Sequence, residues 1–255
     1  MRKTLTTAAV LAAALAAGFL LHSAGTETSP VRVIVSNGIR TTVEELQPQA
    51  ERAIARPLAL EFGTTADLKA KIESGAAFDA ALLTSEAIDD LIKESKIAGP
   101  STPLARCGIG IGMRAGTPKP DIRTPDALKQ SLRDAKSVAY AANGASRVYI
   151  DKMYDRLGIA PDMKTKIYLT QGSVAAGEHV AASQGSLVIT LISEILPMKG
   201  IELVGPLPSS LQNYVNFAGG VGAKAQNSGA AAQFIQFLKG PAAASVYKTK
   251  GMEPR

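Results

Sequence analysis

The sequence holds few of the residues from which proteins build disulfides, metal centres and nucleic-acid platforms. Cys107 is its single cysteine, which excludes an internal disulfide and a zinc site built from cysteines. Beyond the first two dozen residues the only histidine is His179, so a multi-histidine metal site is excluded and a Ser-His-Asp triad would have to use His179. Tryptophan is absent and aromatic residues make up 5% of the chain, which argues against stacking surfaces for single-stranded nucleic acid.

Long apolar runs are also scarce, and the one that stands out lies at the start of the chain. Residues 1–24, MRKTLTTAAVLAAALAAGFLLHSA, begin with Arg2 and Lys3, continue through an Ala- and Leu-rich run and end in small residues. This layout is typical of a cleaved secretory signal peptide. A membrane-spanning helix is the alternative, but it needs about 20 apolar residues, and this threonine-interrupted run is shorter. We therefore expect an exported protein, and the position of Cys107 argues against a lipoprotein.

The charge balance is mildly basic, with a formal net charge of +6 at pH 7. The basic residues are scattered and form no polybasic block, so we expect no nucleic-acid partner. A modest positive excess suits a small anionic ligand. Ordinary solubility charge explains the same excess equally well.

Beyond residue 24, short apolar runs alternate with helical patterns. Three strands are expected at residues 31–35, 58–63 and 79–84, each followed by a helix, at residues 42–56, 64–75 and 85–97. Strand followed by helix, three times over, predicts a parallel sheet with helices on its faces.

The alternation of strand and helix then resumes in the second part of the chain. Further strands are expected at residues 107–116, 137–141, 166–173, 186–195, 201–208 and 214–223, with helices between them and a last helix at residues 228–240. This organisation predicts an α/β protein of two lobes, the first made of residues 25–108 and 213–255, and the second, residues 109–212, inserted into it. The two connections would act as a hinge around a central cleft.

Turns from strand to helix are the informative positions, because parallel α/β sheets bind ligands at the carboxyl ends of their strands. A helix start leaves backbone N–H groups unpaired and carries a partial positive charge, so it can hold an anion without a charged side chain. Plain helix capping is the alternative at each turn. Four such turns combine glycine with hydroxyl or amide residues: Ser36-Asn37-Gly38, Gly63-Thr64-Thr65, Gly144-Ala145-Ser146 and Gln171-Gly172-Ser173.

Two charged residues near these turns are candidates for chemistry. Arg147 follows Ser146 and could hold a carboxylate through two parallel hydrogen bonds, or could be an ordinary surface arginine. In the stretch LISEILP, Ser193 and Glu194 are expected at the end of a strand. Glu194 could accept a hydrogen bond from a ligand, act as a base if its pKa is raised, or cap the following turn. His179 lies inside a helical pattern and is interpreted as a solvated or packed residue.

Two glycine-rich stretches imitate cofactor motifs. Residues 110–115, GIGMRA, have the glycine spacing with which a dinucleotide-binding motif begins. That motif requires a helix to start at the glycines, but the proline-containing GTPKPD that follows cannot form one. Residues 219–225, GGVGAKA, lack the Gly-Lys-Ser/Thr ending of a phosphate-binding loop. We therefore expect neither a cofactor nor a bound metal.

Three stretches carry a resemblance to a known family: SNGIRTTVEELQPQAE, FGTTADLKAKIESGAAFDAALLTSEAIDDLIKESKI and FLKGPAAASVYKTKGMEP. They resemble the periplasmic molybdate-binding-protein-like group, which has the two-lobed type II binding-protein fold. The resemblance covers the chain beyond the signal peptide. It implies a monomer in the periplasm that captures a small anion between its lobes and delivers it to the membrane subunits of an ABC transporter. The ligand-binding residues that it implies are Ser36, Asn37, Gly38, Thr64, Thr65, Ala145, Ser146 and Ser173 or Val174.

The chain also departs from the molybdate binders. Those proteins have a tyrosine near the position of Leu191, whereas this chain has none between Ser173 and Pro197, and Arg147 stands close to the expected site. We therefore expect an organic di- or tricarboxylate rather than molybdate.

A second resemblance, carried by GTPKPDIRTPDALKQSLRDAKSVAYAANGASRVY and LISEILPMKGIELVG, is to periplasmic aconitate isomerases built on the same fold. These enzymes interconvert cis- and trans-aconitate by moving a proton. Such chemistry needs a base near the allylic carbon and donors to the developing negative charge. Glu194 is the available candidate base, and Ser36, Thr64 and Arg147 are candidate donors, but the sequence does not assign the residue that moves the proton.

Overall fold

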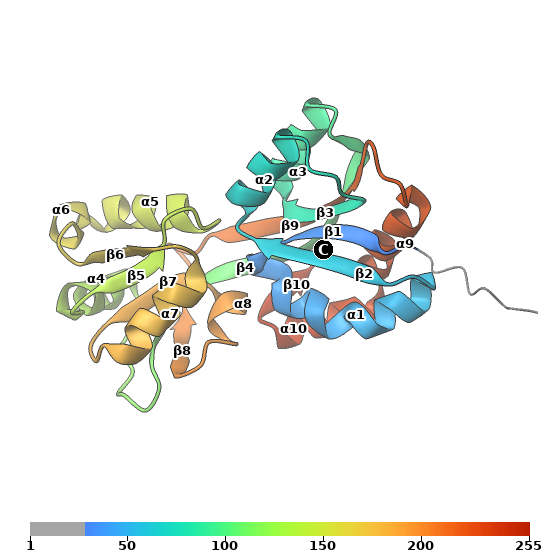
Figure 1. The fold of residues 1–255 in the computed structure, drawn as a ribbon. Coiled ribbons are helices and arrows are strands. Elements are labelled where there is room, and N and C mark those ends of the chain that lie inside the picture. Colours follow the sequence, from blue (N-terminus) through green and yellow to red (C-terminus); the bar gives the residue numbers. More distant parts are fainter. Residues whose placement is uncertain (1–28) are drawn as a thin grey trace, which may run out of the picture.

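Two groups of strands and helices lie side by side in the computed structural model, and the strands β4 and β9 run between them (Figure 1). The structure describes residues 29–255, so the predicted signal peptide at residues 1–24 lies outside the described residues. Within residues 29–255, no helix is both long enough and apolar enough to cross a membrane.

The first group, here called lobe 1, opens with the three strand–helix pairs that the sequence predicts. Its strands are β1 (Val31–Ser36), β2 (Leu58–Gly63), β3 (Ala80–Thr84), β9 (Tyr214–Gly222) and β10 (Met252–Pro254). Its helical elements are the 3-10 turn η1 (Asn37–Ile39), α1 (Arg40–Ile54), α2 (Thr65–Glu73), α3 (Ser85–Lys93), α9 (Ser228–Lys239) and α10 (Pro241–Thr249). β1 pairs in parallel with both β2 and β3, whereas β9 pairs antiparallel with β3.

The second group, lobe 2, has the same layered construction. Its strands are β5 (Val138–Ala141), β6 (Ile167–Thr170), β7 (Leu187–Leu191) and β8 (Ile201–Pro206). Its helices are α4 (Pro125–Asp134), α5 (Arg147–Leu157), α6 (Ala160–Met163), α7 (Ser173–Ala182) and α8 (Ile192–Ile195). β5 pairs in parallel with β6 and β7, so the carboxyl ends of these strands meet at one edge.

The long strand β4 (Ile97–Arg114) belongs to both lobes. Its first part, up to Gly108, pairs with β9, and from Ile109 onward it pairs with β7, while β8 joins at Gly110. The strand order β2-β1-β3-β9-β4-β7-β5-β6 therefore runs without interruption through both lobes. We propose that the lobes meet where β4 changes its pairing partner. Lobe 1 would then consist of residues 25–108 and 213–255, and lobe 2 of the inserted residues 109–212.

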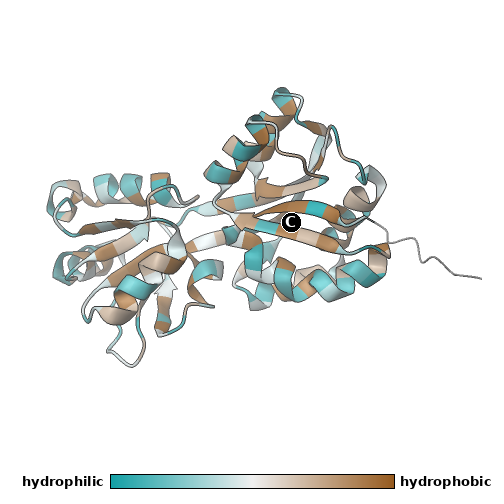
Figure 2. Cartoon of the chain, viewed as in Figure 1, coloured by the Kyte–Doolittle hydropathy of each residue, from teal (hydrophilic) through white to brown (hydrophobic). Residues whose placement is uncertain are grey.

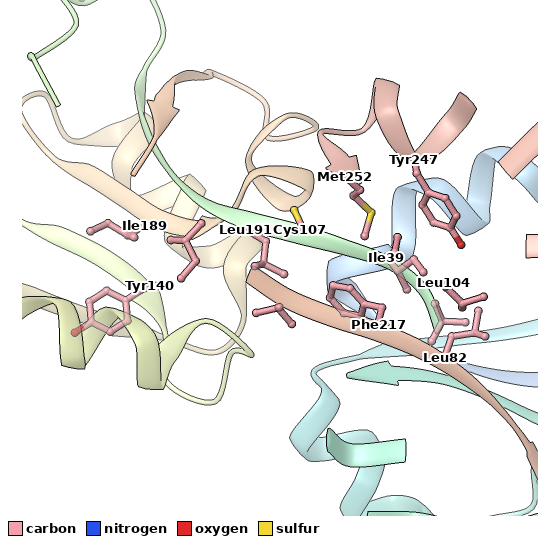
Figure 3. Close-up of a cluster of buried hydrophobic side chains, with 14 of the residues drawn as sticks. Ile39, Leu82, Leu104, Cys107, Tyr140, Ile189, Leu191, Phe217, Tyr247 and Met252 are labelled. Atoms are coloured by element: carbon pink, nitrogen blue, oxygen red, sulfur yellow. The ribbon is translucent and has the colours of Figure 1, made fainter. Parts of the chain in front are cut away.

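The strands carry most of the hydrophobic residues, whereas the helices carry both hydrophilic and hydrophobic ones (Figure 2). The buried side chains of both lobes are mainly apolar. One cluster of buried side chains runs from lobe 1 into lobe 2. In Figure 3, Ile39 and Phe217 of lobe 1 and Leu191 of lobe 2 belong to this cluster along β4. The sequence alternates apolar strands with amphipathic helices, so each sheet buries its faces against the apolar sides of its helices.

A buried carboxylate ties the strands of lobe 1 to the segment that precedes α9. The side chain of Asp79 is fully buried and pairs with the guanidinium of Arg32, 3.3 Å away. It also accepts hydrogen bonds from the backbone N–H of Arg32, at 2.9 Å, of Gln226, at 2.8 Å, and of Asn227, at 3.2 Å. Burial on its own would raise the pKa of Asp79, but these donors together hold it well below its usual range.

The sequence prediction was wrong about two strands. β4, expected over residues 107–116, begins at Ile97, because the helix expected over residues 85–97 ends at Lys93. The strand expected over residues 186–195 ends at Leu191, and Ile192–Ile195 forms the helical turn α8, so Ser193 and Glu194 stand on a helix rather than on a strand. Ile192 and Ile195 are three residues apart, and Ile195 is buried. This spacing suits a helical turn better than the alternation of a strand.

Candidate ligand-binding cleft

The four strand-to-helix turns meet at one narrow cleft between the lobes. It encloses about 280 Å³ of empty space, part of it open to solvent. The part of it that a water-sized sphere can reach is about 10 Å³, room for about one water molecule, so the two walls of the cleft lie close together. The residues that line it are Ser36, Asn37, Gly38, Thr64, Thr65, Ala141, Gly144, Ala145, Ser173, Leu191 and Glu194.

The first turn follows β1 and brings the backbone close to lobe 2. A Cβ atom added at Gly38 would lie 2.8 Å from Leu191 Cδ1 and closer still to Phe217 Cζ. Only glycine therefore fits between these two side chains. The Gly38 carbonyl accepts a 2.7 Å hydrogen bond from Ser193 Oγ, which joins the lobes in a buried position. Ser36 does not cap its helix, since its hydroxyl accepts a 2.9 Å hydrogen bond from Thr65 Oγ1.

The second turn combines a cap with a cleft wall. The Thr64 hydroxyl caps α2 by accepting a hydrogen bond from the Asp67 N–H, and it donates to Asp67 Oδ2 at 2.8 Å. Capping, the alternative stated for these turns, is therefore what the Thr64 side chain does. Thr65 and Ser36 remain as a linked pair of hydroxyls on this wall.

The turns of lobe 2 supply a backbone wall and one buried hydroxyl. Ala145 lines the cleft, while Ser146 is buried at the start of α5 without capping it and is not part of the lining. Ser173 begins α7, and its hydroxyl also leaves its own helix uncapped. It donates instead to Glu194 Oε1 at 3.0 Å.

Glu194 places a carboxylate in the cleft, next to the start of α7. Its other oxygen, Oε2, accepts a hydrogen bond from Thr190 Oγ1. None of the ion pairs found within residues 29–255 involves Glu194. Burial raises the pKa of Glu194, whereas the hydroxyls of Thr190 and Ser173 oppose that rise by donating to the ionised form. A part-buried carboxyl whose pKa is raised is a candidate for proton transfer.

Arg147 and Val174 stand at the predicted turns but do not line the cleft. The Arg147 Nε donates to Asp151 Oδ2 at 2.7 Å, Nη1 lies 3.3 Å from the Ala142 carbonyl, and the guanidinium lies over the ring of Tyr140. The guanidinium is thus engaged along its own helix, a pairing that the four-residue spacing of Arg147 and Asp151 favours. The side chain of Val174 is 64% exposed.

Glu194 also lines a second space, here called the outer compartment, with about 960 Å³ of partly open volume. Its charged lining residues are Arg40, Glu44, Glu178, Glu194 and Lys199. On the opposite side of the cleft, Asn143 Nδ2 of lobe 2 donates to both carboxylate oxygens of Asp67 of lobe 1, at 2.9 Å each. This pair crosses the gap between α2 and the turn after β5.

Three lining or contact residues were not expected from the sequence. Ala141 and Leu191 end strands of lobe 2 and add apolar surface, and Thr190 orients Glu194. The general rule that strand ends bear the site points to Ala141 and Leu191, but no sequence pattern singles out Thr190. His179 lies away from the lining, where Nε2 is 3.0 Å from Ser137 Oγ and the ring stacks on Tyr168. Within residues 29–255, no group of three or more His, Cys, Asp or Glu is placed to hold a metal ion.

Comparisons with known proteins agree with this architecture. The sequence is 30% identical to an aconitate isomerase from Pseudomonas sp. over 229 residues, 87% of each chain. The structure resembles the periplasmic molybdate-binding protein of Azotobacter vinelandii, with a TM-score of 0.74, 16% identity, and 87% of this chain and 98% of that one covered. It also resembles L-phospholactate-bound PEB3, a Campylobacter jejuni protein, with a TM-score of 0.66, 17% identity, and 88% of this chain and all of that one covered.

These likenesses confirm the predicted α/β fold of two lobes, and the structural ones, at such low identity, speak for the fold alone. Residues 31–253, nearly all of the described chain, match the profile of a single family. The protein belongs to the family of bacterial extracellular solute-binding proteins.

Proposed function

We propose that this protein captures a small organic acid with two or three carboxylates between its lobes, in the periplasm, and delivers it to an ABC transporter. The observation that carries the proposal is the convergence of four strand-to-helix turns, two from each lobe, on one cleft. Helix starts offer unpaired N–H groups and partial positive charge to an anion. The transporter and the periplasmic location rest on the family to which the chain belongs.

The lining favours an organic acid over an inorganic oxyanion. An oxyanion such as molybdate is polar on every side, whereas Ala141, Ala145 and Leu191 give this cleft an apolar strip between its polar turns. A ligand with carboxylates joined by a short carbon skeleton matches both kinds of surface. We propose that the ligand contacts the residues named from the sequence: Ser36, Asn37, Gly38, Thr64, Thr65, Ala145, Ser146, Arg147, Ser173 and Val174. Three of them, Ser146, Arg147 and Val174, do not line the cleft and would have to act from outside it.

A thermal-shift screen tests the proposal, with citrate, cis- and trans-aconitate and succinate set against molybdate, tungstate and sulfate. A ligand at a hundredfold excess over its Kd stabilises the folded state by about 2.7 kcal/mol, or about 5–11 °C for a chain of this size. We expect this shift with a carboxylate. Ser36→Ala should weaken it, whereas Ser74→Ala, at the far end of α2, should not. Shifts with the oxyanions alone would contradict the proposal.

Isomerisation of aconitate is the second candidate, favoured by the part-buried carboxyl of Glu194 in the cleft and by the 30% identical relative. The Glu194 carboxylate would take a proton from the methylene carbon of aconitate, and the electron pair left behind would spread over the three-carbon unit. The same proton would return to the former vinyl carbon, so the double bond moves by one position and can re-form in the other geometry. Ser36 and the helix starts would stabilise the negative charge. The hydroxyl of Thr64 and the guanidinium of Arg147, the other candidate donors, are already engaged.

Chromatographic separation of the isomers after incubation with trans-aconitate tests this candidate. We expect the cis isomer to appear with the wild-type protein and to be lost with Glu194→Gln, while that variant still shows a thermal shift with trans-aconitate. Equal turnover by Glu194→Gln would remove Glu194 as the base. A thermal shift without turnover by the wild-type protein would leave the binding function alone.

A further inference from the structure

We infer that the cleft takes up its carboxylate ligand together with one proton, which is held on Glu194. This inference rests on the proposed function, since it requires a carboxylate guest. It adds the ionisation state in which the site receives that guest. The geometry of Glu194 carries it, because the carboxyl group stands on the wall where the ligand must lie.

An ionised Glu194 would repel an anionic guest at short range. Two unit negative charges about 4 Å apart in a partly buried site repel each other enough to weaken binding by roughly a thousandfold. The hydroxyls of Ser173 and Thr190 satisfy both Glu194 oxygens but bring no positive charge to offset that repulsion. A protonated Glu194 instead removes the repulsion and adds a donor.

The other titratable groups around Glu194 do not replace the proton. From α1, Arg40 and Glu44 face the outer compartment, where Arg40 Nε is bound to Glu44 at 2.8 Å. Glu178 on α7 adds negative charge there, and Lys199, beyond α8, is exposed.

Two further groups lie on strands that pack against α8. Cys107 on β4 is buried, and burial raises the pKa of its thiol, so it stays neutral. Glu202 on β8 is paired with Lys119 at 2.6 Å. Glu194 is therefore the group in the cleft whose charge can change when an anion enters.

The raised pKa of Glu194 agrees with this geometry. Linkage sets the expected dependence on pH: once the free protein carries Glu194 ionised, binding must take up a proton, and affinity then falls by about tenfold per pH unit. Below that range the group is already protonated and the dependence on Glu194 disappears. For the isomerase candidate the same group must release its proton to begin a cycle, so kcat would rise with pH while affinity falls.

Isothermal titration calorimetry with trans-aconitate, at pH 6 to 9 and in two buffers of different ionisation enthalpy, tests the inference. The ligand's own carboxyls can also bind protons, so the result is the difference between wild type and Glu194→Gln. We expect wild type to take up as much as about one proton more than the variant, and to lose affinity at alkaline pH, where the variant stays flat. Glu178→Gln, which removes an exposed carboxylate of the outer compartment, should behave as wild type.

Three outcomes would overturn the inference. Equal proton uptake by wild type and Glu194→Gln, with binding intact in both, would overturn it and leave the proposed function standing. The same holds if Glu178→Gln removes the pH dependence and Glu194→Gln does not. Absence of heat with trans-aconitate and with every other carboxylate of the thermal screen would overturn the proposed function, and this inference with it.

Discussion

Replacing Gly38 by alanine tests how the first turn fits between the lobes. The added Cβ would lie 2.8 Å from Leu191 Cδ1 and closer still to Phe217 Cζ, so the turn or these side chains must move. Both neighbours belong to the apolar cluster that runs through the two lobes, where side chains have little freedom to shift. Overpacking of this kind costs about 1–3 kcal/mol. For a chain of this size that corresponds to a fall in Tm of about 2–12 °C.

Thermal and urea unfolding of Gly38→Ala measure this effect, and two further variants make the measurement specific. Gly229→Ala is the matched control, because a Cβ there has no neighbour within 4 Å and lies near the start of α9, so that variant should keep or slightly gain stability. Gly38→Ala combined with Phe217→Leu removes the closest clashing ring, so its loss of stability should be less than the sum of the single losses. A Gly38→Ala protein as stable as wild type, or strict additivity in the double variant, would refute the reasoning.

Three further predictions concern one buried side chain of lobe 1 and two side chains around the cleft. Asp79→Asn should lose about 3 kcal/mol of stability at neutral pH, because buried donors lose their charged partner. The lowered pKa of Asp79 means that the carboxylate stabilises the fold above about pH 4 and does so less as the pH falls, so urea unfolding at pH 7 and pH 3 should show the gap to wild type narrowing. Asn143→Ala removes the hydrogen bonds to Asp67 across the cleft and should lower the free energy of unfolding by less than about 1 kcal/mol. It should also speed the dissociation of trans-aconitate, measured by stopped flow. An unchanged rate would show that the pair does not hold the lobes together. Thr190→Val removes a donor to ionised Glu194, so its pKa should rise further and the alkaline loss of trans-aconitate affinity should begin at higher pH than in wild type.

Much of the fold could be predicted because local signals agree with the long-range ones. Thr64 caps α2 and the left-handed Gly75 follows its end, as the sequence indicates. The rule that ligands bind beyond strand ends selected four turns, and all four contribute to one cleft. The antiparallel pairing of β3 with β9 is joined across more than a hundred residues, and no local pattern encodes such a contact.

The details of the candidate site depend on side-chain partners that the sequence leaves open. Arg147 was expected near a carboxylate ligand, but Asp151, one helical turn away, competes for the same guanidinium. Glu194 was placed on a strand, and only the turn after Leu191 brings it beside Ser173, which lies on another helix. Partner choice of this kind depends on three-dimensional proximity, which periodicity does not report.

The path of the chain through β4 and β9 has a consequence for how the molecule is made. The second lobe is one continuous stretch, whereas the first needs β9, α9, α10 and β10, which the ribosome produces last. During synthesis the middle of the chain can therefore reach its final shape while the opening strands still expose an unpaired edge along β3. Such an edge is prone to aggregation until the last segment arrives. Loss of the final forty residues would remove most of β9 together with α9, α10 and β10. β3 would then keep its unpaired edge. Such a truncated product should be degraded by proteases rather than work as a smaller protein.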